Sequence, residues 1–305
     1  MHMNRRIVLA GFGGIALAGI IKPSPAFSSI AIGDAEILTV SDGHLSMPAD
    51  FFFAGLPEAE LSNILASHDM TSDQLKPPCN VTLLRSGDRT VLFDAGSGSA
   101  FMPTAGDLLD SLDMLDVTPE DITDIVFTHC HPDHLWGVLD DFDDPLFSEA
   151  NYLMGQVEWD YWSNPETVNT IGDARTTFAV GAARRLEAIE DRCSFFIDGQ
   201  EIMPGIKAHA SFGHTPGHMC FEIRSGNDAV LVGGDAIGNH HVAFERPDWA
   251  SGADQDKETA ARTRVQLLDK LAHEQMALIG FHLPDGGIGR VERKDSSYRF
   301  VPETA

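Results

Sequence analysis

The chain has 305 residues, 43% of them hydrophobic, which is sufficient for one large domain with an extensive core. Lys and Arg total 21 against 46 Asp and Glu, so the formal net charge is -25. Such a surface repels phosphate backbones and anionic lipid. The composition therefore argues against nucleic acid as a partner.

The first 28 residues have the pattern of an export signal. Arg5 and Arg6 precede the apolar run IVLAGFGGIALAGII, and the small residues up to Ser28 suit a signal peptidase. The run is shorter than the roughly 20 residues that a bilayer-spanning helix needs, so we expect cleavage, with an uncleaved anchor as the alternative. The arginine pair resembles a twin-arginine signal. We therefore expect a periplasmic or secreted domain over 29–305, with no stable membrane insertion.

The mature region alternates predicted strands and helices. RTVLFDAGSG (89–98) predicts a buried strand that ends in a glycine turn, GDLLDSLDMLDV (106–117) has helical periodicity, and DITDIVF (121–127) predicts another strand. Two amphipathic helices are expected over 175–192 and 257–275, with the short apolar strands MCFEIRS and AVLVGG between them. No long linker or repeat interrupts this order, which indicates one layered α/β domain.

The four cysteines are widely spaced and form no CxxC pair; they are Cys79, Cys130, Cys193 and Cys220. Export would permit a disulfide. A domain of this size does not need one, so we expect ordinary buried thiols.

The strand over 121–127 runs directly into the stretch THCHPDH, which places His129, His131, Asp133 and His134 within six positions. A loop that leaves a buried strand can curl these side chains around a common point. Imidazole and carboxylate suit Zn, Mn, Fe or Co, and the lack of thiolates argues against a Cys-rich structural zinc site. Four ligands so close in sequence would strain a single site, which favours two adjacent ions.

THCHPDH is followed in order by FGHTPGH, GGDA and GFHLP. This series resembles the metallo-β-lactamase superfamily over 35–301. The resemblance implies a four-layer αββα sandwich with a metal site where the two sheets meet at one edge. It also implies the ligands: His129, His131 and His214 for one ion, Asp133, His134 and His282 for the other, and Asp235 as the bridge between them. Zinc is favoured, with Mn, Fe and Co left open.

Residues near these ligands have expected supporting roles. His214 and His218 flank the turn TPG, and we expect His214 to be the ligand while His218 forms hydrogen bonds within the loop. By resemblance, Asp94 supports a ligating histidine; capping a turn is its alternative role. His240 and His241 are expected to be pocket or surface residues. Cys130 should point away from the site, into the core.

Two adjacent ions would activate a water and polarise the bond that the water attacks, so the reaction expected is hydrolysis. Asp133 and Asp235 are the candidates that orient this water and handle its proton. By resemblance, a common zinc β-lactamase would carry cysteine where Asp235 stands. Flavodiiron proteins would carry glutamate where His131 stands.

A more detailed resemblance is to the exported branch that includes methyl parathion hydrolase and related lactone and aryl-ester hydrolases. It rests on GHTPGHMCFEI, on GGDAIGNHHVAFERPDW and on GFHLPDGGIGRVERKDSSYRFVP near the end of the chain. Many acyl homoserine lactonases carry a tyrosine where this chain has Gly238, so a lactonase mechanism would rely on the metals or on another donor. The aromatic runs 158–162 and 50–55 supply Trp162 and Phe52 as candidate substrate contacts.

These observations predict an exported binuclear hydrolase of small apolar esters, foremost lactones or aryl esters, with phosphotriesters as side substrates. One alternative is a thioesterase of the glyoxalase II kind, which would need a basic patch for its anionic substrate. The other is a metal-binding protein without catalysis, which would be expected to have lost ligands. The expected partner is a small-molecule substrate, and a homodimer is compatible with the sequence.

Overall fold

The computed structural model describes residues 28–71 and 74–303. The predicted export signal lies outside these residues except for Ser28, the first residue of strand β1 (Ser28–Ile32). No helix in the described part of the chain is long and apolar enough to cross a membrane.

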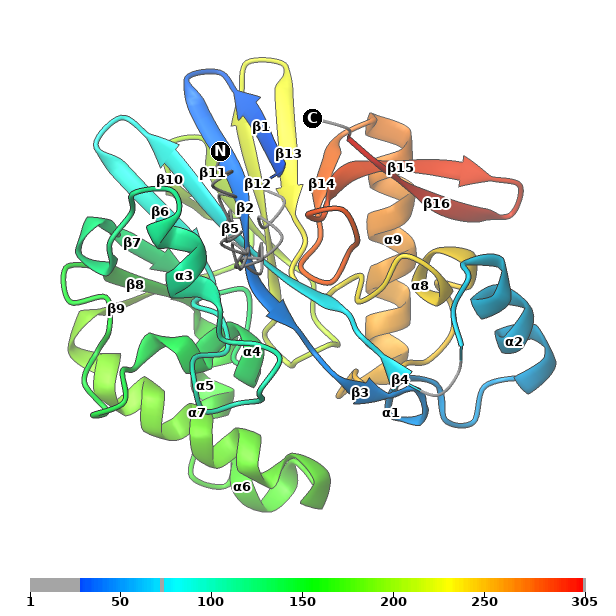
Figure 1. Ribbon diagram of the computed structural model, residues 1–305, viewed down its shortest axis with the longest axis horizontal. Helices are drawn as coiled ribbons and strands as arrows, with labels where there is room; N and C mark the ends of the chain where they lie inside the picture. The colour runs from blue at the N-terminus through cyan, green and yellow to red at the C-terminus, as the bar shows by residue number, and fades with distance from the viewer. Residues whose placement is uncertain (1–27, 72–73, 304–305) are drawn as a thin grey trace, which may run out of the picture.

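Two seven-stranded sheets form the centre of the domain (Figure 1). The first has the order β1, β2 (Ala35–His44), β5 (Pro78–Ser86), β6 (Arg89–Phe93), β7 (Asp124–Val126), β8 (Asn151–Gly155), β9 (Cys193–Phe196). The second has the order β10 (Glu201–Met203), β11 (Ile206–Ala210), β12 (Met219–Ser225), β13 (Asp228–Val232), β14 (Ala277–Ile279), β15 (Ile288–Lys294), β16 (Ser297–Pro302). Strands β6 to β9 pair in parallel, as do β13 and β14. A short separate ladder joins β3 (Met47–Pro48) to β4 (Gln74–Leu75).

The two sheets pack face to face through a continuous apolar layer. Phe93 and Val126 of the first sheet belong to one buried cluster with Phe221, Val232 and Ile279 of the second. Both sheets are also covered on their outer faces, which explains why β6, β7, β13 and β14 each end in an uninterrupted apolar run.

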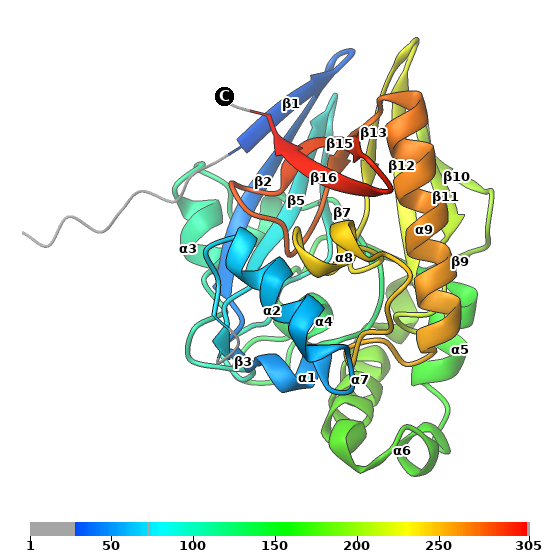
Figure 2. The ribbon, with the colours of Figure 1, turned by 90° about the vertical axis from the view of Figure 1, so that its right-hand side faces the viewer.

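Helices form the two outer layers (Figures 1 and 2). Against the first sheet, Leu112 of α3 (Leu108–Asp113) and Leu186 of α7 (Thr176–Ile189) join its outer core. Against the second, Leu268 and Leu271 of α9 (Lys257–Glu274) pack on Leu278. The predicted four-layer αββα sandwich is thus confirmed.

Shorter helices lie in the connections: α1 (Ala49–Phe53), α2 (Glu58–Ser67), α4 (Pro132–Leu135), α5 (Gln156–Trp162), α6 (Thr167–Thr170) and α8 (Val242–Glu245). Turns of 3₁₀ helix cover η1 (Pro119–Asp121), η2 (Trp136–Val138), η3 (Asp173–Arg175) and η4 (Glu190–Arg192).

The predicted elements are present, with shorter bounds in two cases. The helix expected over 175–192 is α7 with η3 and η4 at its ends, and the helix over 257–275 is α9. The strand over 121–127 has only three residues in the sheet, and the helix over 106–117 is reduced to α3. The cysteines are free thiols, three of them buried and Cys193 half-buried, so the expectation of buried thiols holds for three of the four.

Candidate metal centre and active site

The histidine cluster occupies the turn between β7 and α4. His131 is extended, with φ -66° and ψ 159°, because the following Pro132 disfavours helical backbone at the residue before it. Pro132 then begins α4, which carries Asp133 and His134 in its first turn. The change of backbone direction lets side chains two and three residues apart face the same point.

Seven side chains from four loops converge at the ends of β7, β11, β13 and β14. They form two groups, and within each group the potential ligand atoms lie within 4.8 Å of one another. The first group is His129, His131 and His214, and the second is Asp133, His134, Asp235 and His282. The structure therefore brings together all seven residues that the sequence singled out as ligands.

Asp235 belongs to the second group and also approaches the first. Its Oδ2 atom is 3.3 Å from Nε2 of His214, in the first group, and 3.2 Å from Nε2 of His282, in the second. Its Oδ1 atom is 3.3 Å from Nε2 of His134. A carboxylate with oxygens shared in this way has the placement that the predicted bridge requires.

Several atoms of the cluster are buried without a hydrogen-bond partner among the described residues. They are Nε2 of His129, Nε2 of His134, Oδ2 of Asp133 and Oδ1 of Asp235. Orphaned buried polar atoms are costly and rare in folded proteins, so four in one cluster indicate a missing partner. Nitrogen and oxygen donors without thiolate fit two divalent transition-metal ions.

The electrostatics of the cluster favour metal binding. Burial and the neighbouring histidines hold the pKa of His129 well below its usual value, so its imidazole is neutral. Burial also lowers the pKa of His134, but Asp235 and Asp133 outweigh this effect and hold that pKa well above its usual value. Burial would raise the pKa of Asp235, yet His282 and His134 hold it well below its usual value. The carboxylates are therefore ionised, and cation binding at His134 displaces a proton.

Asp94 supports the cluster from the end of β6. Its carboxylate accepts from the Thr128 backbone N–H at 2.7 Å and the Thr128 hydroxyl at 2.8 Å, and it lies 2.8 Å from Nδ1 of His134. Its backbone has φ 71°, a strained region for a residue other than glycine. Asp94 thus fixes the His134 ring with Nε2 toward the cluster, as expected for a carboxylate behind a ligating histidine.

His218 is close to the cluster but belongs to neither group of ligand atoms. Its Nδ1 atom lies 2.7 Å from the Ser211 hydroxyl, and its Nε2 atom accepts from the Asp235 backbone N–H at 3.0 Å. Both nitrogens are thus used within the protein. His218 positions the backbone of Asp235, in agreement with the hydrogen-bonding role expected for it.

Cys130 faces the core, away from the metal-binding atoms. It is fully buried, and its Sγ atom lies 3.5 Å from Sδ of Met154.

Glu158 on α5 is a supporting residue that the sequence reasoning missed. It is fully buried, and Oε1 accepts from the Cys130 backbone N–H at 2.9 Å and from Nε1 of Trp162 at 2.6 Å. Oε2 accepts from the Thr215 hydroxyl at 2.7 Å and from the Gly217 backbone N–H at 2.9 Å. One carboxylate thus ties the loop of His129 and His131 to the loop of His214.

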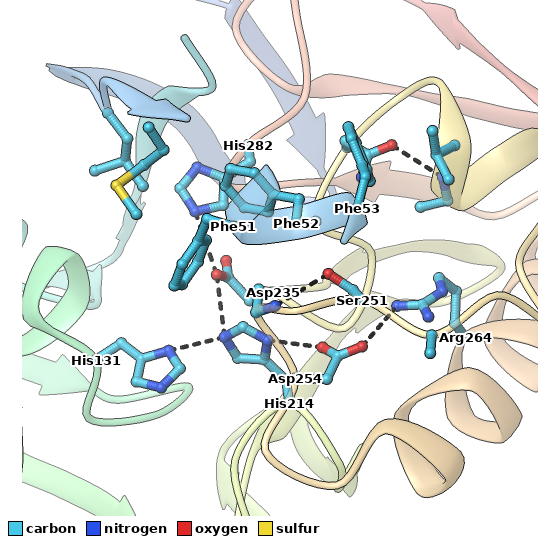
Figure 3. A pocket seen from close by; sticks show the side chains of 18 of the residues that line it. Phe51, Phe52, Phe53, His131, His214, Asp235, Ser251, Asp254, Arg264 and His282 are labelled. Carbon is cyan, nitrogen blue, oxygen red and sulfur yellow. Dashed lines mark hydrogen bonds and ion pairs between the residues drawn. The ribbon is translucent and has the colours of Figure 1, made fainter. Parts of the chain in front are cut away.

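Asp254 and Arg264 also support a candidate ligand, His214, and were not found by the sequence reasoning. Oδ1 of Asp254 lies 3.1 Å from Nδ1 of His214, and Arg264 contacts the other Asp254 oxygen at 3.4 Å. Figure 3 shows this chain continuing to His131, whose Nδ1 atom lies 2.9 Å from Nε2 of His214. No local motif marks these partners, because 40 residues separate Asp254 from His214.

The assignment of Trp162 to the substrate pocket is wrong. Its side chain is fully buried in the core of the first sheet, and its indole N–H is used by Glu158. It does not line the cavity above the metal cluster. The packing of α5 directs Trp162 into the core, and the sequence of the aromatic run does not reveal this direction.

An open cavity lies above the cluster and is here called the first cavity. Its floor includes Asp133, Asp235 and His282, and Phe52 lies in its wall, as predicted. Figure 3 shows that α1 also brings Phe51 and Phe53 to this region. The remaining lining is mainly apolar: Leu45, Met47, Phe101, Phe178, Val242, Ala243 and Trp249.

The three arginines that line the first cavity are held by other protein groups. Arg264 donates to the carbonyls of Pro247 and Trp249, besides its contact with Asp254. Arg246 pairs with two surface carboxylates, and Arg175 donates to two backbone carbonyls of the 250–253 loop. The described lining thus offers no arginine without a protein partner for an anionic substrate.

The model of the metallo-β-lactamase superfamily matches residues 76–274, and the chain belongs to this superfamily. The recognition made from the histidine motifs is confirmed, and the coarse class is a metal-dependent hydrolase. No curated protein matches at a significant level.

Solved structures extend the likeness over nearly the whole chain. AidC, a dizinc quorum-quenching lactonase solved with the product N-hexanoyl-L-homoserine, is 26% identical with a TM-score of 0.86, covering 92% of this chain and 98% of its own. The hydrolase AbOPH is 26% identical with a TM-score of 0.85, covering 93% and 99%. A probable metal-dependent hydrolase from Staphylococcus aureus is 21% identical with a TM-score of 0.71, covering 90% and 100%, and supports the fold alone.

Proposed function

We propose that this protein is a binuclear metallohydrolase that cleaves lactones or small apolar esters, with phosphotriesters as side substrates. The observation that carries the proposal is the position of Asp235, whose carboxylate approaches ligand atoms of both groups on the floor of an apolar cavity. The likeness to a dizinc lactonase supports lactones as the first substrate class and zinc as the first metal to test.

The residues of the site have different roles in the proposed reaction. Two divalent ions held by these residues would supply a Lewis acid for the substrate oxygen and would activate a water. Asp133 and Asp235 lie on the cavity floor, where their carboxylates orient that water and accept its proton. The phenylalanines of α1 bind the apolar part of the substrate and exclude bulk water. Asp94, Asp254 and the backbone contact of His218 hold the ligands in position.

The cavity favours neutral substrates over glutathione thioesters. A glutathione moiety carries carboxylates, which need cationic partners when they are buried. Because the lining arginines are held by protein oxygens, an anionic group would have to compete with existing ion pairs and hydrogen bonds. This argument ranks the ester or lactone hydrolase above the glyoxalase II-like thioesterase. The periplasmic or secreted location proposed for the enzyme rests on the sequence of residues 1–28 alone.

The test combines metal analysis with a substrate panel. We expect about two transition-metal ions per chain, and hydrolysis of a lactone and an aryl ester far above that of a glutathione thioester. The Asp235→Asn variant keeps the shape of the side chain but removes its charge, so activity should fall by orders of magnitude with little change in the fold.

Three results would contradict this function. One is a single tightly bound ion with no gain in activity when metal is added. Another is wild-type turnover by metal-loaded, folded Asp235→Asn protein. The third is a preference for the glutathione thioester over both neutral substrates.

A further inference from the structure

A second cavity lies beside the first and has no part in the reaction described above. The two cavities share four lining residues, which are Phe52, Gly238, Asn239 and His282. The second cavity thus adjoins the metal cluster at His282, one of its candidate ligands. Phe52 forms part of the wall of both cavities, on the α1 side (Figure 3).

The lining of the second cavity suits a neutral, mainly apolar group. It is built largely from Met70, Leu75, Pro77, Pro78 and Pro284, with the imidazoles of His240 and His241. Burial lowers the pKa of His240 to about 4 and that of His241 to about 3, so both rings are uncharged at neutral pH. The one formally charged residue in this lining, Lys76, is exposed.

Gly238 stands where the two cavities meet, and its lack of a side chain leaves space there. A Cβ atom added at Gly238 would meet no heavy atom within 4 Å, and the backbone does not adopt the left-handed conformation that favours glycine. Gly234, in the same loop, contrasts with it: its φ is +49°, and an added Cβ would lie 2.7 Å from Nε2 of His218. Local backbone geometry thus requires glycine at 234 but not at 238.

We propose that the second cavity is a second substrate compartment, entered past Gly238, and that the enzyme acts on neutral esters or lactones with a sizeable apolar group on each side of the scissile carbonyl. This inference rests on the proposed function for the reaction, but binding to the compartment is independent of turnover. The carbonyl lies at the junction near His282, with one substituent in each cavity. Gly238 is then a specificity-determining residue, because a larger side chain there narrows the passage.

The first experiment measures binding without turnover. Alkyl phenyl ketones, with alkyl chains from methyl to nonyl, are titrated by calorimetry into metal-loaded wild type and Gly238→Leu. In the wild type, affinity should rise with chain length by up to roughly three- to fourfold per methylene. In Gly238→Leu it should stop rising after the first few carbons. Met70→Trp places a larger side chain in the lining of the second cavity. In this variant, too, ketone affinity should stop rising at a shorter alkyl chain than in the wild type.

The second experiment measures kcat/KM for p-nitrophenyl esters from acetate to decanoate. The ratio of octanoate to acetate should fall at least tenfold in Gly238→Leu, with bound metal and melting temperature unchanged. Ala66→Leu adds apolar bulk on an exposed part of α2, away from both cavities, and should match the wild type.

The outcomes separate the two proposals. If ketone affinity depends on chain length identically in the wild type and in both narrowed variants, the second compartment is overturned, whatever the enzyme hydrolyses. If the ketones show the expected change but no ester or lactone is cleaved, the compartment stands and the proposed function fails.

Discussion

At the scale of single residues, buried carboxylates outside the ligand set decide how the ligands are held. Asp94 fixes the ring of His134, and Asp254 lies against His214. Glu158 differs from both, because it contacts no ligand side chain and instead accepts four hydrogen bonds from the surrounding structure. Three of these bonds come from the two ligand-bearing loops, so Glu158 is a positioning residue for the His129, His131 and His214 group.

Glu158→Gln should weaken metal binding selectively. The amide replaces one acceptor oxygen with a donor, which then faces two existing donors and loosens one of the two loops that Glu158 joins. We expect affinity at the His129, His131 and His214 group to fall by roughly 10- to 100-fold, with a smaller change at the other group. A competitive chelator titration resolves the two ions, and the visible spectrum of the cobalt-loaded protein reports the altered geometry.

Asp124→Asn is the matched control for this variant. Asp124 is an equally buried carboxylate on β7 that pairs with Arg89, and it belongs to neither ligand group. Its loss should lower stability without changing metal affinity. If Glu158→Gln weakened both ions equally, or neither, the positioning role would have to be abandoned.

At the scale of elements, α1 contributes the aromatic wall of the first cavity although it has only five residues. A helix this short has little stability of its own, so tertiary contacts must hold it. The Gly252 backbone N–H donates to the Phe52 carbonyl at 2.8 Å, and Arg175 donates to the Gly252 carbonyl at 2.7 Å. The backbones approach so closely that a Cβ at Gly252 would lie 1.8 Å from the Phe51 carbonyl oxygen. Gly252 is therefore one of the contacts that hold α1 against the domain, together with the buried side chains of Ala49 and Phe53.

Gly252→Ala should displace α1 and open the cavity wall. We expect KM for bulky apolar esters to rise by roughly tenfold, as for the loss of one aromatic contact worth about 1.4 kcal/mol, while KM for a small ester changes little. Steady-state kinetics on both substrates measure this difference. Ala54→Ser, at the exposed residue that follows α1, is the control and should leave KM unchanged for both substrates. Equal effects of Gly252→Ala on large and small esters would show that α1 does not contact the substrate.

At the scale of the whole molecule, the metal site joins the two halves of the sandwich. His129, His131, Asp133 and His134 follow β7 of the first sheet, whereas His214, Asp235 and His282 follow strands of the second. Ions bound by both sets of residues would therefore link the two sheets, in addition to the apolar layer between them. Without ions, the four orphaned polar atoms of the cluster remain buried and uncompensated.

Removing the metal should lower the melting temperature. An ion present at a thousand times its dissociation constant stabilises the folded state by about 4 kcal/mol, and a change of 1 kcal/mol shifts Tm by roughly 2–4 °C in a large domain. We therefore expect chelation to lower Tm by on the order of 10 °C, with recovery when metal is added back. Calorimetry with parallel metal analysis tests this. An unchanged Tm after verified removal of both ions would show that the site does not link the two halves.

The candidate ligands and the order of the main elements were predictable from the sequence alone. THCHPDH contains four candidate ligands, and FGHTPGH, GGDA and GFHLP each contain one more. These motifs can be recognised locally because each places a candidate ligand close to the glycine or proline of a turn. The long amphipathic helices and the apolar strands were also predictable, since burial on one or two faces produces a period in the sequence.

The surroundings of those residues could not be predicted from the sequence, because they depend on how distant segments pack. Trp162 and Phe52 both belong to aromatic runs, yet one is buried in the core and the other lines both cavities, because the direction of an aromatic side chain depends on how its helix is packed. The contacts of Glu158 and Asp254 with the loops that carry the candidate ligands span 28 to 59 residues. Such partners meet through the packing of separate loops, which leaves no local pattern in the sequence, and the space beside Gly238 exists only once those loops have packed.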